Sequence, residues 1–137
     1  MSVSLQELKD AASGVCARLM QTLVDFRTQV ESHVAEYKNE RGTFRQDAQK
    51  RLDNYKVRNF TGSTDALIAI AQKNLELMQK EDQDYYAAQN ELISNINNAI
   101  NEIGNIRDKI PEAKDSDEVM DLVTQIHTKT IIKRQGE

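Results

Sequence analysis

Apolar side chains recur every three or four residues from Leu67 to Ile110, and no proline interrupts this stretch. This spacing is typical of one face of a single helix, and Asp82 is the only polar residue on the stripe. A helix of that length extends for roughly 65 Å, whereas a compact domain of this chain length has a radius of gyration near ~14 Å. The stripe therefore predicts an elongated arrangement in which long partner helices lie beside this one.

The composition agrees with a helical chain, because it has one proline, five glycines and no tryptophan in 137 residues. The predicted fold class is all-α: an elongated antiparallel helical hairpin, or a bundle of long helices, with a short C-terminal helix. We expect one domain over residues 1–137.

The first helical arm is predicted over residues 4–58. It starts at a capping box formed by Ser4 and Glu7. Gly42 lies in the middle of the arm, where the apolar stripe continues with little loss of phase. A single glycine costs a helix only about 1 kcal/mol. We therefore expect a bend or a continuous helix at Gly42 rather than a long loop.

A reversal is predicted at residues 59–63, where asparagine, glycine and two hydroxyl residues cluster. Ser63 or Thr61 is expected to cap a second helix over residues 64–110. That helix should end before Pro111, since proline disfavours helical geometry in the residue before it.

A second capping box predicts the last helix. Asp115 is followed three positions later by Glu118, and a short apolar pattern comes after them. We therefore expect a short C-terminal helix over residues 116–132.

Isoleucine is concentrated in the second half of the long helix and occupies more than one stripe there. Two arms packed side by side cannot cover both edges of such a face, so either the short C-terminal helix or another chain must cover the rest. The residues expected to form an interface are Ile93, Ile96, Ile100, Ile103 and Ile106.

Charge is unevenly distributed along the chain. Residues 38–58 hold seven bases and three acids, a net of +4, whereas residues 81–121 hold eleven acids and three bases, a net of −8. Nucleic-acid binding is one interpretation of the basic stretch. The overall charge of −4 and the lack of interleaved aromatic residues favour a solvated helix face instead, so we expect no nucleic-acid partner.

Residue types that carry catalysis or bind metal do not form a recognisable motif. Neither His33 nor His127 has the glutamate three residues earlier that di-iron helical bundles use. Cys16 is the only cysteine, and the pattern around it is that of a small apolar helix position. We therefore expect a protein that is not an enzyme, with no metal, no cofactor and no evident small-molecule ligand.

No run of 18 apolar residues is present, and the N-terminus lacks a basic region followed by an apolar block. A membrane span and a secretory signal peptide are not expected. A single cysteine fits a reducing compartment, so the predicted location is cytoplasmic. Export by a route independent of a signal peptide stays open.

The order long helix, Phe60-Thr61-Gly62, long helix resembles the WXG superfamily of type VII secretion substrates, in which a Trp-x-Gly turn joins two antiparallel helices. The resemblance implies that Phe60 caps the open end of a hairpin and that Gly62 permits the tight reversal. Phenylalanine replaces tryptophan here, and no Tyr-x-x-x-Asp/Glu export motif follows the hairpin. The resemblance implies a small helical partner or targeting factor for a secreted protein.

Two classes of function are compatible with these patterns. The first is an interaction protein, such as a secretion partner, chaperone or targeting factor, whose helices bind another helical protein. The second is a self-assembling coiled-coil structural component that binds a second copy of itself. A specific heteropartner would favour the first class, and self-association alone would favour the second.

Overall fold

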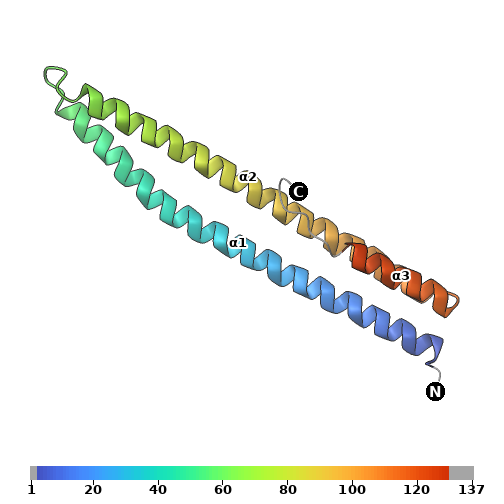
Figure 1. Ribbon diagram of the computed structural model, residues 1–137. Helices are drawn as coiled ribbons and strands as arrows, with labels where there is room; N and C mark the ends of the chain where they lie inside the picture. The colour runs from blue at the N-terminus through green and yellow to red at the C-terminus, as the bar shows by residue number, and fades with distance from the viewer. Residues whose placement is uncertain (1–2, 130–137) are drawn as a thin grey trace. The chain divides into compact units, whose positions relative to one another are not determined.

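The computed structural model describes residues 3–129, and all regular elements in this part of the chain are helical. Figure 1 shows the α-helices and the loops that join them. The elements are α1 (Leu5–Val57), α2 (Asp65–Lys109), the 3-10 turn η1 (Ile110–Glu112) and α3 (Ser116–Lys129). The predicted all-α helical hairpin with a short C-terminal helix is therefore confirmed. Residues 130–132 of the predicted last helix lie outside the described residues.

Helix α1 begins where the capping box placed it. The backbone N–H of Glu7 donates to Ser4 Oγ over 3.1 Å, which satisfies one of the free N–H groups of the first turn. The helix then continues through Gly42 to Val57 without a break. A Cβ at Gly42 would meet no atom within 4 Å, so this glycine is not required by close packing.

The reversal between α1 and α2 depends on Gly62 and Asn59. Gly62 has φ = 75°, a conformation that side chains with a Cβ rarely adopt, and no other residue described here has positive φ. Asn59 Oδ1 accepts the backbone N–H of Thr64 over 3.1 Å, and Asn59 Nδ2 donates to Asp65 Oδ1 over 2.8 Å. The predicted reversal is thus a hydrogen-bonded turn, and Asn59 is the side chain that connects its two sides.

Two expectations for this turn are wrong. Helix α2 begins at Asp65, so the residue at its N-terminal capping position is Thr64 and not Ser63 or Thr61. The Thr64 hydroxyl donates back to the carbonyl of Tyr55 over 2.7 Å and so ties the start of α2 to the end of α1. Phe60 is 87% exposed, so its ring does not cap the end of the hairpin. The hydrogen bonds of Asn59 hold the turn together without a contribution from the Phe60 ring.

The C-terminal junction follows the predicted signals closely. Helix α2 ends at Lys109, and Pro111 lies in η1. Asp115 Oδ1 then accepts the N–H of Glu118 over 2.9 Å, and Glu118 Oε2 accepts the N–H of Lys114 over 2.7 Å. This reciprocal pairing caps α3 at its N-terminus.

The chain divides into two compact units, and the expectation of one domain over residues 1–137 stays a prediction. Unit 1 contains Met1–Val30 and Asn90–Glu137, and unit 2 contains Glu31–Gln89. In unit 1 two bonds show that α1 runs antiparallel to α2 and the following η1: Lys9 Nζ donates to the carbonyl of Pro111 in η1 over 2.9 Å, and Arg27 donates to Asn97 Oδ1 in α2 over 2.7 Å.

Unit 1 is a three-helix arrangement with an apolar core. In Figure 1, α3 lies beside the C-terminal part of α2. All three helices contribute to one buried cluster, which includes Ala12 and Cys16 from α1, Ile96 and Ile103 from α2, and Val119 from α3. The cluster explains why an asparagine-rich and isoleucine-rich segment is helical, because packing compensates for its weak helix propensity.

Unit 2 contains two helical segments joined by the turn. Its buried residues are Leu52 from α1 and Ala71 and Asp82 from α2. Tyr37 stacks on Tyr85, and the Thr64 hydroxyl bonds the carbonyl of Tyr55, so these segments also run antiparallel. Unit 2 differs from unit 1 in having no third helix and in burying a charged residue.

Candidate functional site

The isoleucines expected to form an interface lie mostly in the core of unit 1. Ile96, Ile103 and Ile106 are buried, and Ile93 and Ile100 are half-buried and pack against the same cluster. The expectation of a free interface is therefore corrected for the three buried residues, because α3 supplies Val119 and Ile126 to cover them. For Ile93 and Ile100 an interface role stays a prediction.

Asp82 is the centre of a polar cluster inside unit 2. Its carboxylate is 5% exposed, and Oδ1 accepts hydrogen bonds from Arg41 Nε over 2.8 Å and from the Tyr37 hydroxyl over 2.9 Å. Arg41 also bonds Glu81 Oε2 over 2.9 Å and the carbonyl of Met78 over 3.3 Å. A buried carboxylate is costly unless it is paired in this way.

The second oxygen of Asp82 faces a second arginine. Arg45 Nε lies 3.4 Å from Asp82 Oδ2, and neither atom has a hydrogen-bond partner. The two groups therefore attract each other as charges without the alignment of a hydrogen bond. Asp82 is thus held between Arg41 and Arg45, which are one helical turn apart on α1.

Three tyrosines pack against one another, and one of them, Tyr37, contacts the ion pair. Tyr37 and Tyr85 stack with their centroids 3.7 Å apart, and Tyr86 meets both rings edge-on at 5.8 Å and 5.7 Å. The guanidinium of Arg41 lies 5.7 Å from the centre of the Tyr37 ring. We call these residues, together with Asp82, Arg45 and Glu81, the Asp82 cluster.

Mutual pairing also shifts the pKa values in this cluster. Burial by itself raises the pKa of Asp82, but hydrogen bonds from Arg41 and Tyr37 and the charges of Arg41 and Arg45 outweigh burial, and the pKa is lowered. Burial and the hydrogen bond to Asp82 raise the pKa of Tyr37. The hydrogen bond to Asp82 raises the pKa of Arg41. The cluster thus holds a charged carboxylate and a neutral phenol, and its hydrogen bonds fix the register of the two helices.

The sequence pointed to Asp82 as the polar exception on its stripe but not to its partners. In the sequence, Tyr37 is 45 positions and Arg41 is 41 positions away from Asp82. Their identity depends on the register of the two helices, which periodicity alone does not give.

A groove runs along the surface of unit 2 next to this cluster. It consists of two adjoining hollows that share Ala48, Arg51 and Asn74. Large apolar side chains form its walls and are 44% to 60% exposed, whereas the smaller Ala71 is buried at its floor. The walls are Phe44 from α1 and Leu67, Ile70 and Leu77 from α2. We call this feature the hairpin groove.

Exposed apolar side chains are concentrated in unit 2. Among the residues whose burial the structure describes, the large exposed ones in unit 1 are Val3, Phe26 and Met120, and those in unit 2 are Phe44, Val57, Phe60, Leu67, Ile70 and Leu77. Four of those six line the hairpin groove. An apolar surface gathered in one groove is typical of a binding site rather than of scattered surface residues.

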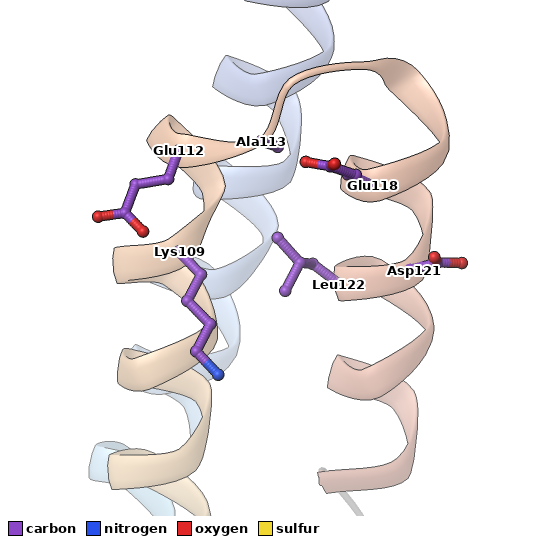
Figure 2. Close-up of a pocket in the computed structure, with 6 residues that line it drawn as sticks. All are labelled: Lys109, Glu112, Ala113, Glu118, Asp121 and Leu122. Carbon is purple, nitrogen blue, oxygen red and sulfur yellow. The ribbon is translucent and has the colours of Figure 1, made fainter.

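Unit 1 has a smaller hollow where α2, η1 and α3 meet (Figure 2). Leu122 points from α3 towards α2, and Lys109 is the one basic residue among the six that line the hollow. Glu118 is already used in the cap of α3 through its bond to the Lys114 N–H. The hollow thus lies at the α2 to α3 junction, and one of its three acidic side chains is already engaged in the cap.

The other candidate residues are the two histidines and the single cysteine. His33 is exposed and lies 3.7 Å from Glu36, and the side chain of His127 lies outside the described residues. Cys16 is buried in the core of unit 1, where burial raises the pKa of its thiol. Among the residues that the structure describes, no three histidine, cysteine or acidic side chains gather to hold a metal ion. In the same part of the chain, no helix has both the length and the hydropathy needed to cross a bilayer.

Comparison with known proteins does not assign the chain to a family. No protein-family model, curated protein or solved structure matches it. The WXG resemblance of the Phe60-Thr61-Gly62 turn stays a prediction.

Proposed function

We propose that this chain is a non-enzymatic helical interaction protein that binds another helical protein through the hairpin groove. The observation that carries this proposal is the row of exposed side chains on α2, where Leu67, Ile70, Asn74 and Leu77 follow one another at steps of three and four residues. This is the spacing with which one helix packs on another. The row begins at Leu67, where the packing stripe of α2 also begins, and it then continues along a neighbouring face through Ile70, Asn74 and Leu77.

The Asp82 cluster supports a binding role rather than a catalytic one. The Tyr37 hydroxyl and the Arg41 guanidinium both bond Asp82 Oδ1, and the other carboxylate oxygen faces Arg45, so these groups are directed at one another. By fixing the register of the two helices, they hold the walls of the groove in place. A rigid groove binds with less loss of conformational entropy than a mobile one.

A narrower form of the proposal follows from the resemblance of the turn to the WXG superfamily. The chain would then be a partner, chaperone or targeting factor for a secreted helical protein. The second candidate is a self-assembling coiled-coil component, for which the same α2 row would pair with a second copy.

Site-specific photo-crosslinking in the native cell tests the proposal. A photoreactive amino acid is placed at Ile70 in the groove, and at the exposed Gln72 on another face of α2 as a matched control. We expect a helical protein to be captured from Ile70 and not from Gln72. The captured protein is then purified, and its binding to the wild type is compared with its binding to Ile70→Asp.

The outcomes separate the two candidates. A heteropartner that binds the wild type and loses affinity for Ile70→Asp supports the interaction protein. Crosslinks only between copies of this chain, together with dimers in sedimentation that Ile70→Asp abolishes, would replace it with the self-assembling component.

A further inference from the structure

Among the described residues, the two most exposed of the large apolar side chains lie together at the end of α1 and in the turn that follows. Phe60 is 87% exposed and Val57 is 73% exposed. Neither belongs to the lining of the hairpin groove. Figure 1 shows the turn extending beyond the ends of α1 and α2. We call residues 56–64 the hairpin tip.

The backbone of the hairpin tip is hydrogen-bonded within the tip itself. The N–H of Asn59 donates to the carbonyl of Lys56 over 3.3 Å, and the N–H of Phe60 donates to the carbonyl of Arg58 over 3.1 Å. The N–H of Thr64 donates to the Asn59 side chain. A backbone group without a partner is costly in an apolar medium, so these bonds lower the cost of moving the tip out of water.

Basic side chains flank the exposed apolar pair. Lys56 and Arg58 are exposed, and they are the only charged residues between positions 54 and 64. The nearest acids are Asp53 and Asp65, and Asp65 already accepts a hydrogen bond from the Asn59 side chain. The wider stretch 38–73 holds eight bases and four acids, a net of +4. The tip therefore combines apolar side chains with a positive charge that nearby acids do not cancel.

This combination matches the surface of an anionic bilayer, where acyl chains lie directly below phosphate groups. Apolar side chains leave water at that boundary, while the long stems of lysine and arginine let their charged ends stay at the phosphates. A stable protein interface buries about 800 Å² on each partner, whereas Phe60 and Val57 together expose only on the order of 300 Å². A bilayer accepts such a small apolar tip because it needs no matching shape.

We propose that the hairpin tip inserts Phe60 and Val57 into the surface of an anionic lipid bilayer and places Lys56 and Arg58 against its phosphate groups. The inference goes beyond the proposed function, because its residues lie outside the hairpin groove. It concerns attachment to one leaflet, for which no membrane-spanning helix is needed.

Fluorescence of an introduced tryptophan tests the insertion, since the chain contains no tryptophan of its own. Full-length Phe60→Trp is titrated with vesicles of equal parts phosphatidylcholine and phosphatidylglycerol. We expect its emission to shift to the blue and to become protected from acrylamide, because the indole leaves water. Phe44→Trp is the matched control: this position is also exposed but lies about 20 Å along α1 from Val57, and its emission should not change.

Sedimentation with the same vesicles measures how strongly the chain binds them. Phe60→Ala should lower the partition coefficient about tenfold, because most of the apolar area of the ring is lost. Replacing Lys56 and Arg58 together by glutamine should lower it roughly tenfold or more, and the wild type should bind vesicles of phosphatidylcholine alone correspondingly weakly. Circular dichroism of each variant checks that helicity is retained.

The groove variant Ile70→Asp separates this inference from the proposed function. It should bind vesicles as the wild type does, since Ile70 lies outside the hairpin tip. If vesicles fail to bind while the crosslink at Ile70 still captures a heteropartner, this inference fails and the proposed function stands.

Three results would overturn the inference. The first is an emission of Phe60→Trp that the anionic vesicles leave unchanged, including the case in which a photoreactive amino acid at Phe60 captures a protein instead. The second is an equal change for Phe60→Trp and Phe44→Trp, which would mean that the side of the hairpin meets the bilayer. The third is a partition coefficient that Phe60→Ala does not alter.

Discussion

Arg41 Nε donates to Asp82 Oδ1 over 2.8 Å, and this bond joins α1 to α2 across a seam that is otherwise mainly apolar. The bond requires one register of the two helices, since a shift by one residue would leave Asp82 buried without a partner. Buried polar groups can set register in this way in helical assemblies. The position of the hairpin groove depends on that register.

We predict that Asp82→Ala lowers the free energy of unfolding of unit 2 by about 2 kcal/mol, because Arg41 and Tyr37 lose a charged hydrogen-bond acceptor. The loss is smaller than for a fully buried pair, since Arg45 is 40% exposed and can turn to solvent. All four tyrosines of the chain lie in unit 2, so tyrosine fluorescence during urea unfolding measures this unit. The exposed Asp84→Ala is the control and should change stability by less than about 0.5 kcal/mol.

The stability that Asp82 contributes should decrease as the pH is lowered. Its pKa in the folded protein is below the ordinary 3.8, so its stabilising effect is complete above that value and is lost as the pH falls through the folded pKa. The difference in stability between the wild type and Asp82→Asn should stay constant from about pH 5 to 8 and shrink below about pH 4. A difference that persists unchanged at pH 2 would show that the carboxylate charge is not what stabilises unit 2.

At high pH, deprotonation of Tyr37 should lower the stability of unit 2, whereas at low pH it is protonation of Asp82 that does so. Its pKa is raised, so the stability that it contributes is present below pH 10 and is lost as the pH rises through the folded value. Far-UV circular dichroism melts of the wild type and Tyr37→Phe above pH 10 measure this loss. The wild type should lose more stability with rising pH than Tyr37→Phe does, and equal losses would contradict the assignment.

Two glycines of unit 2 should respond to alanine with opposite signs. Gly62→Ala should cost about 1 kcal/mol or more, because φ is 75° and a Cβ would lie 3.0 Å from Asp65 Oδ2. Gly42→Ala should stabilise by roughly 0.5–1 kcal/mol, because it lies inside α1 with open space around it. Urea unfolding followed by tyrosine fluorescence measures both, and a neutral Gly62→Ala would indicate a loose linker.

Ile103→Ala should destabilise unit 1 by about 3 kcal/mol, because its side chain is fully buried in the core. Cys16 provides the measurement, since this single thiol is buried in the same core and reacts only when unit 1 opens. We expect its labelling by a thiol reagent to accelerate about 100-fold, which corresponds to that loss of stability if opening is in rapid equilibrium. The exposed Met120→Ala is the control, and similar rates in both variants would show that Ile103 is not part of the core.

The sequence by itself determined the helices and most of their ends. The continuous stripe, the capping boxes at Ser4 and Asp115, and Pro111 act over a few neighbouring residues, so their effect can be read locally. Asp82 is the only polar residue on the same stripe, so the sequence also indicated that this position is unusual. The caps proposed for α2 were wrong because the Thr64 hydroxyl bonds Tyr55 on the preceding helix, which is a contact between elements.

Only the tertiary structure decided which apolar surfaces are covered. Ile96 and Leu77 both lie at helical spacing on α2, yet the first is buried in a core to which α3 contributes and the second is left 46% exposed. The register that pairs Asp82 with Arg41 is likewise a property of two distant segments. Periodicity fixes the face of one helix to which a side chain belongs, but burial depends on which other helix packs against that face, and this depends on the fold of the whole chain.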